Sequence, residues 1–115
     1  MLTVDGERLF ERIARLASSE WNLSGQLGLV TGATYPAEIA SVRRLAPTLP
    51  LLVPGIGAQG GDVEACVKAG IDAKKGGMVI NSGRAILYAS QGEDWREAAR
   101  AAAVATRDAI NAARR

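Results

Sequence analysis

The sequence contains no histidine and only one cysteine, Cys66, among its 115 residues. A single cysteine cannot form a disulfide within the chain, and a Cys/His zinc site has no ligands here. Because the chain has no histidine, serine–histidine catalysis within it is also excluded. We expect no metal site. Cys66 lies in the helix-like segment DVEACVKAG, where the thiol is expected to be a small buried apolar group.

Long apolar runs and strong charge are also missing. No apolar stretch approaches the roughly 20 residues of a membrane span, and the N-terminal VDGERLFERIA lacks the pattern of a signal peptide. The net charge is only +2, and the basic residues do not cluster with aromatic residues. These features argue against binding to nucleic acid or to a membrane. We therefore expect a soluble cytoplasmic protein with a packed core.

Helix-like and strand-like segments alternate along the chain. Helices are predicted at 8–18, 36–46, 60–70, 84–90 and 92–115, and strands with continuous apolar runs at 27–34, 49–55 and 76–83. The runs are typical of strands buried on both faces. We find no hairpin signal in the sequence and expect no hairpin. The alternation therefore predicts an α/β fold with a parallel sheet and right-handed crossovers.

Two helices carry more specific signals. In the first, Leu9, Ile13 and Leu16 are spaced as one apolar stripe, which predicts that they face the core. In the last, Asp94 and Glu97 stand three residues apart, the spacing of a capping box at a helix start.

Glycine-rich loops follow two of the predicted strands. The first loop reads PGIGAQGGD (54–62) and contains Gln59, and the second reads NSGRAI (81–86) and contains Gly83 and Arg84. Because neighbouring strands lie about 4.8 Å apart, these loops can share one ligand. Backbone amides, an amide side chain and a guanidinium suit phosphate. The alternative is two plain turns and a surface charge, and neither the Rossmann nor the P-loop fingerprint is present.

Three segments carry a family resemblance: LGLVTGATYPAEIASVRRLAP, LLVPGIGAQGGDVEACVKAG and MVINSGRAILYAS. They resemble the C-terminal part of orotidine 5′-phosphate decarboxylase in its longer bacterial form, from about residue 8 to the end. The resemblance implies a (β/α)8 barrel that converts orotidine monophosphate to uridine monophosphate without a cofactor. It assigns the substrate phosphate to Gln59, Gly83 and Arg84, and the substrate pocket to Pro54, Gly57 and Thr34.

The catalytic residues of that family have no counterpart in this chain. They form a D-x-K-x-x-D network on earlier strands, and the nearest look-alike, DAKKGG (72–77), lacks the last aspartate. That segment falls in a predicted helix-to-strand turn, at the opposite end of the sheet from the glycine loops. Asp62 and Glu64 are expected to be first-turn helix carboxylates. We therefore expect no catalytic residue in this chain and no activity from the chain alone.

Residues 1–115 are expected to form one partial barrel domain, because a complete barrel needs about 250 residues. Three parallel strands leave two sheet edges and an uncovered inner face. The chain is then a fragment, a short relic, or a protein that associates with itself or with a companion chain. Two other functions stay open: a non-catalytic phosphate- or nucleotide-binding half-barrel or assembly module, and another barrel enzyme such as a sugar-phosphate epimerase. The missing histidines argue against the epimerase.

Overall fold

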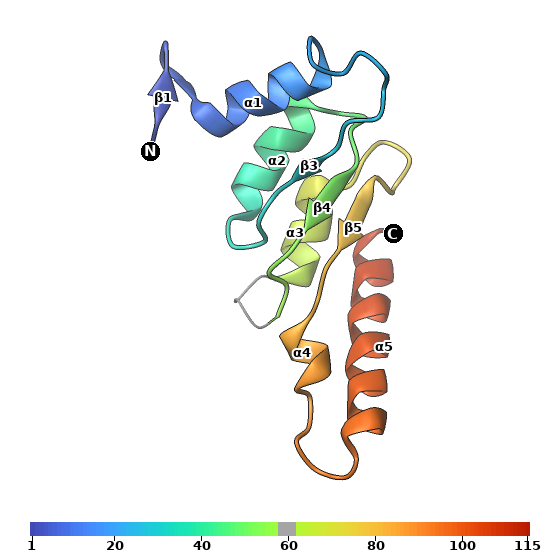
Figure 1. The fold of residues 1–115 in the computed structure, drawn as a ribbon. Helices are drawn as coiled ribbons and strands as arrows, with labels where there is room; N and C mark the ends of the chain where they lie inside the picture. The colour runs from blue at the N-terminus through green and yellow to red at the C-terminus, as the bar shows by residue number, and fades with distance from the viewer. Residues whose placement is uncertain (58–61) are drawn as a thin grey trace.

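The computed structural model describes residues 1–57 and 62–115, and its elements alternate as predicted after residue 8 (Figure 1). The elements are β1 (Thr3–Val4), β2 (Glu7–Arg8), α1 (Leu9–Ser18), β3 (Leu29–Val30), α2 (Pro36–Leu45), β4 (Leu51–Val53), α3 (Val63–Gly70), β5 (Met78–Ile80), α4 (Arg84–Leu87) and α5 (Trp95–Ala113). Among the described helices, α5 is the longest with 19 residues, and α1 and α2 have 10 residues each.

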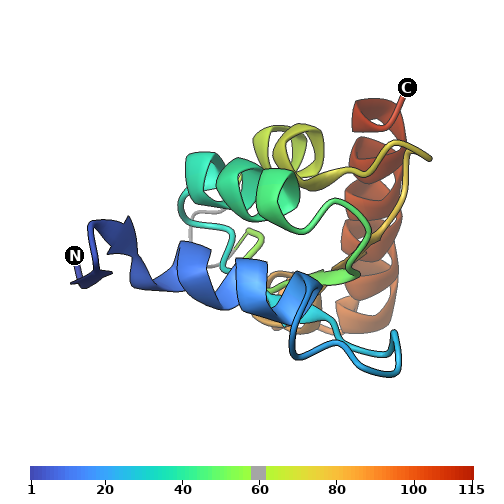
Figure 2. The same cartoon turned by 90° about the horizontal axis from the view of Figure 1, so that it is seen from above.

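The strands β3, β4 and β5 form one parallel sheet in chain order, as the sequence predicts. The register is Leu29 with Leu51, Val30 with Leu52, Leu52 with Val79, and Val53 with Ile80. Successive helices contact one another, α1 with α2, α2 with α3 and α3 with α5. Figure 2 shows them as an arc around the outside of the strands.

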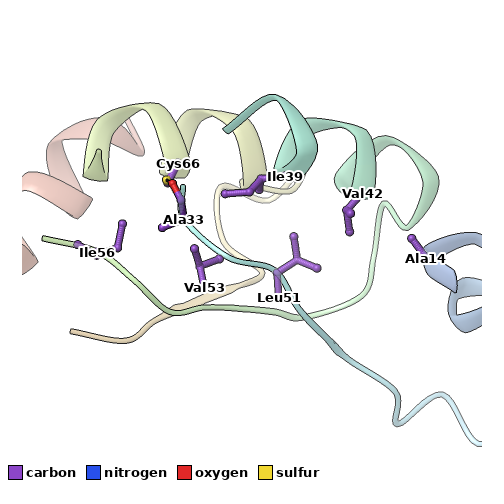
Figure 3. Close-up of a cluster of buried hydrophobic side chains, with 8 residues drawn as sticks. All are labelled: Ala14, Ala33, Ile39, Val42, Leu51, Val53, Ile56 and Cys66. Atoms are coloured by element: carbon purple, nitrogen blue, oxygen red, sulfur yellow. Dashed lines mark hydrogen bonds between the residues drawn. The ribbon is translucent and has the colours of Figure 1, made fainter. Parts of the chain in front are cut away.

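The core lies between this sheet and helices α2 and α3 (Figure 3). Leu51 and Val53 are fully buried there against Ile39. Cys66 is also buried, and its Sγ donates a hydrogen bond to the carbonyl oxygen of Ala33 at 3.2 Å. Burial raises the pKa of the Cys66 thiol, so the thiolate is disfavoured. The predicted buried role of Cys66 is confirmed.

The other face of the sheet is bare. Val30, Leu52 and Val79 are paired in register across the three strands, and they are 68%, 39% and 61% exposed. The prediction that each strand is buried on both faces is therefore wrong, whereas the predicted uncovered face is present. These three side chains form a continuous apolar row, which we call the bare row.

The N-terminal residues form a hairpin that was not predicted from the sequence. β1 and β2 pair antiparallel around Asp5 and Gly6, whose φ angles are 53° and 81°. Asp-Gly is a preferred pair for the two-residue turn that joins antiparallel strands, because both positions need positive φ. The prediction of no hairpin was wrong because this dipeptide stood next to the strong helical pattern of α1.

The predicted apolar stripe of α1 is only partly buried. The helix packs through Ala14 and Ala17, while Leu9 and Ile13 remain exposed. The small residues allow α1 to approach α2 closely, and Ile13 lies beside Val30 and Thr31 of the β3 edge. The position of the helix in the chain agrees with the prediction, but the buried face carries Ala14 and Ala17 instead of Leu9 and Ile13.

The predicted capping box of α5 does not form. Asp94 occupies the cap position, but its side chain makes no capping hydrogen bond. Its carboxylate instead accepts a hydrogen bond from the Ser90 hydroxyl. The start of the helix is thus tied to the preceding loop rather than to Glu97.

Arg43 joins several elements at the amino-terminal end of the sheet. Its guanidinium is buried and donates hydrogen bonds to the carbonyl oxygens of Gly70 (2.6 Å), Leu49 (2.7 Å), Gly77 (2.9 Å) and Ala46 (3.1 Å). Burial lowers the pKa of this guanidinium, and the charge of Asp72 opposes that shift. Arginine nonetheless remains protonated in proteins, so one buried cation holds α2, α3, β4 and β5 together.

Asp72 organises the turn between α3 and β5. Its Oδ1 accepts hydrogen bonds from the backbone amides of Gly76 and Lys74, both at 2.9 Å. These bonds, with the amide of Gly76 contributing most, lower the pKa of the Asp72 carboxyl, and the charge of Arg43 adds to the effect. The DAKKGG segment is therefore a structural turn, as predicted, and it lies at the opposite end of the sheet from the glycine loops.

The pKa of Asp72 makes the stability of the fold sensitive to acid. A carboxylate with a lowered folded-state pKa stabilises the fold above its unfolded pKa of about 4, and that contribution is lost as the pH falls further. The Asp72→Asn variant is expected to lose less stability than the parent chain between about pH 4 and pH 2. Urea unfolding across this range measures the difference. If the free energy of unfolding falls equally steeply with pH in the two chains, Asp72 does not contribute to the acid sensitivity of the fold.

Candidate functional site

The carboxyl ends of the three strands lie at one edge of the sheet, because the strands are parallel. The backbone pairing continues beyond the strands. The Ala33 amide donates to the Pro54 carbonyl oxygen at 3.0 Å, and the Asn81 amide donates to the Val53 carbonyl oxygen at 3.1 Å. Pro54 is thus fixed beside the turn that carries Thr34, as the predicted substrate pocket requires.

The loops after β4 and β5 are in contact. Gly57 has a φ of +78°, and a Cβ added there would lie 3.0 Å from the Cβ of Ala85 in α4. Glycine is required at this position by both its backbone conformation and the proximity of α4. The expectation that the two glycine loops lie close together is confirmed at Gly57. Gln59 lies outside the described residues, and its role stays a prediction.

Replacing Gly57 with alanine is expected to destabilise the fold by about 1–2 kcal/mol, because the new methyl group meets Ala85 and φ is positive. Gly32→Ala is the matched control. Gly32 lies two residues beyond the neighbouring strand β3, and a Cβ there meets no atom within 4 Å. Thermal unfolding of both variants measures the difference, and an equally small loss in both would contradict the close contact.

The turn into α4 presents backbone amides and a cation to solvent. Gly83 precedes the helix and Arg84 is its first residue, and both are exposed. The Gly83 carbonyl oxygen accepts from the amides of Ile86 and Leu87, which leaves the amides of Gly83 and Arg84 directed away from the helix. Arg84 has no ion-pair partner within residues 1–57 and 62–115. This arrangement can bind a phosphate group at the surface of the loop.

Two hydroxyl groups near the ends of the strands were not singled out from the sequence. Thr31 Oγ1, after β3, and Ser82 Oγ, after β5, are buried and have no hydrogen-bond partner among the described residues. Serine and threonine are too common at strand ends for either to be recognised from the sequence. A buried hydroxyl without a hydrogen-bond partner costs free energy, which sets these two side chains apart from the other hydroxyls near the strand ends.

The other predicted carboxylates have structural roles. Asp62 caps α3 by accepting a hydrogen bond from the Ala65 amide at 2.9 Å, and Glu64 forms an ion pair with Lys68 one turn on. In the described part of the chain, no three acidic or cysteine side chains are grouped so that they could hold a metal ion. Among the same residues, no helix has the length and apolarity needed to cross a membrane.

Comparison with known proteins gives a consistent match. The model of the family described as Orotidine 5'-phosphate decarboxylase / HUMPS matches residues 4–102. A curated orotidine 5'-phosphate decarboxylase of Azoarcus sp. is 67% identical over 113 residues, which cover 98% of this chain and 42% of the relative. The protein of the same name from Leptothrix cholodnii is 62% identical over 111 residues and is covered to 39%. The chain thus spans about two fifths of these relatives.

Solved structures show the same relation. The chain superimposes on the UMP synthase of Leishmania donovani with a TM-score of 0.84 and 43% identity, covering 98% of this chain and 24% of that one. It matches the OMP decarboxylase of the same organism with a TM-score of 0.78 and 42% identity, over 41% of that chain. The arrangement in Figure 1 is therefore part of a larger barrel fold in both neighbours.

Proposed function

Because the chain belongs to the Orotidine 5'-phosphate decarboxylase / HUMPS family, we propose that it is the phosphate-binding, C-terminal part of an orotidine 5′-phosphate decarboxylase. Such an enzyme converts orotidine monophosphate to uridine monophosphate and carbon dioxide. The observation that carries the proposal is the contact of the two glycine loops at the carboxyl edge of the sheet, at Gly57 and Ala85. The names of the similar proteins favour this activity over a non-catalytic half-barrel.

The substrate phosphate is bound by Arg84 and Gly83, with Gln59 completing the site. The amides of Gly83 and Arg84 donate to phosphate oxygens, and the planar guanidinium adds a charged two-pronged contact. Gln59 supplies an amide from the neighbouring loop, as the family resemblance implies. Thr34, Pro54 and Gly57 line the adjoining pocket for the rest of the nucleotide.

The phosphate lies away from the carbon that loses carbon dioxide, so its binding energy acts indirectly. Contacts to a remote part of a substrate can hold the closed, reactive arrangement and so raise the rate as well as the affinity. The lysine and aspartate network belongs to the part of the barrel that this chain does not include. Activity therefore requires the rest of the barrel, and we propose an enzyme that uses no cofactor and acts in the cytoplasm.

The proposal is tested by calorimetric titration of the purified chain with uridine monophosphate. Titration with uridine, which lacks the phosphate, is the matched control. We expect uridine monophosphate to bind at least about 100-fold more tightly, since several charge-assisted hydrogen bonds depend on the phosphate. Equal affinities for the two compounds would overturn the phosphate assignment.

A further inference from the structure

The exposed face of the sheet continues beyond the strands as a second row of residues. The Ala33 amide bonds to the Pro54 carbonyl oxygen, and the Asn81 amide bonds to the Val53 carbonyl oxygen, so the parallel pairing extends one layer past the bare row. Because side chains alternate between the two faces of a strand, the residues of this layer on the exposed face are Gly32, Pro54 and Asn81. We call these three residues the upper row.

The exposure of the residues around β5 supports this placement of Asn81. Met78, Ile80 and Ser82 are partly buried. Val79 and Asn81, which alternate with them, are exposed. The period of two residues therefore continues through Asn81, and its side chain shares the face of Val79. The backbone amide of Asn81 is used in the sheet, which leaves its exposed carboxamide for a ligand.

Asn81 is the polar member of the upper row. Gly32 has no side chain, and a Cβ there would meet no atom within 4 Å, so the space over this end of the row is open. Pro54 presents an apolar ring, which neither donates nor accepts a hydrogen bond. A carboxamide offers two N–H donors and one carbonyl acceptor. Of these three side chains, only that of Asn81 can form hydrogen bonds with a ligand that lies on the upper row.

The distance of Asn81 from the phosphate turn indicates which part of the ligand it reaches. Asn81 precedes Gly83 by two residues, which corresponds to about 6–7 Å along an extended chain. In a nucleoside monophosphate, the sugar is attached to the phosphate, and the base lies beyond the sugar. Ribose carries two neighbouring hydroxyl groups, each a donor and an acceptor, and this pair matches the donor and the acceptor of a carboxamide.

We propose that the Asn81 carboxamide binds the ribose hydroxyls of the nucleotide and so makes the site selective for ribonucleotides. This inference rests on the proposed function, because a phosphate bound at Gly83 and Arg84 determines where the sugar lies. Pro54, the neighbour of Asn81 in the upper row, then contacts the nucleotide beside the sugar. Asn81 positions the substrate and determines specificity, and it takes no part in breaking a bond.

Calorimetric titration with two nucleotides tests the inference. The purified chain is titrated with uridine monophosphate and with 2′,3′-dideoxyuridine monophosphate, which lacks both hydroxyls. The parent chain is expected to bind uridine monophosphate about 10-fold more tightly, because two hydrogen bonds depend on the hydroxyls. In Asn81→Ala this ratio of affinities is expected to fall to about 2 or less, while the affinity for the dideoxy compound stays within about 2-fold of the parent value.

Two further variants separate binding from folding. Asn81→Val places a strand-forming residue next to Val79 on the same face, so this variant is expected to keep the fold and still to lose the ratio. Asn111→Ala removes another exposed asparagine, on α5, and is expected to leave the ratio unchanged. Thermal unfolding of the variants shows that each one is folded under the conditions of the titration.

The outcomes distinguish this inference from the phosphate assignment. A ratio near one in the parent chain, an unchanged ratio in both Asn81 variants, or an equal loss of affinity for both nucleotides would each overturn the role of Asn81. The phosphate assignment is judged separately, by the preference of the parent chain for uridine monophosphate over uridine. If that preference is present and the ratio does not respond to Asn81, this inference fails alone. If the preference is absent, the proposed function fails, and this inference fails with it.

Discussion

Replacing Arg84 with alanine is expected to lower kcat/KM for orotidine monophosphate by about 100-fold or more in an assembled enzyme that contains the whole barrel. The variant loses a charged two-pronged contact to the substrate phosphate. Because Arg84 is exposed and pairs with no described carboxylate, the substitution removes little from the fold. The loss is therefore expected in substrate use and not in stability, which steady-state kinetics and thermal unfolding measure separately.

Two further variants refine this result. Arg84→Lys keeps the positive charge but loses the planar fork, so an intermediate kcat/KM is expected. Arg100→Ala removes another exposed arginine, on α5, and is expected to leave kcat/KM unchanged. Near-normal kcat/KM in Arg84→Ala, or an equal loss in Arg100→Ala, would contradict the assignment of Arg84 to the phosphate.

Replacing Arg43 with methionine is expected to lower the free energy of unfolding by about 3 kcal/mol or more. Methionine fills a similar space but donates no hydrogen bonds, so the carbonyl oxygens of Gly70, Leu49 and Gly77 lose a buried donor. These carbonyls belong to the end of α3 and to the residues that directly precede β4 and β5. The effect is therefore expected on the whole sheet rather than on one helix.

The adjacent residue provides the control. Arg44 is exposed, and the hydrogen bond that its guanidinium donates to the Ser41 hydroxyl is long, at 3.4 Å. Arg44→Met is expected to change the free energy of unfolding by less than about 0.5 kcal/mol. Urea unfolding of the two variants gives the comparison. A similar small loss in both would show that the buried guanidinium does not hold the sheet.

This pair of arginines also shows what a sequence can and cannot predict. The apolar spacing of α2 places Ile39 and Val42 in the core, and the structure agrees. It does not distinguish Arg43 from Arg44, because the difference depends on carbonyl groups up to 34 residues away along the chain. The carbonyl oxygens that bind Arg43 come together only when the strands have paired in the folded chain.

The order of helices and strands was predictable because each apolar run ends at a glycine or proline turn, and the parallel sheet follows from that alternation. The contact between the loops at Gly57 and Ala85 follows in turn from strand adjacency. The exposure of Leu9 and Ile13 was not predictable from periodicity, because an apolar pattern gives the face that is suited to burial and not the neighbour that covers it. The exposure of the bare row followed instead from the small number of strands.

The most direct test of the central claim is a set of amide NMR spectra of the ¹⁵N-labelled chain. Uridine monophosphate, uridine and the Arg84→Ala variant would be compared. If the phosphate lies at the start of α4, the amide resonances of Gly83 and Arg84 shift with uridine monophosphate, do not shift with uridine, and the Gly83 shift is lost in the variant. Resonances of Gly83 and Arg84 that stay in place at saturating uridine monophosphate, or that shift equally with uridine, would contradict the claim.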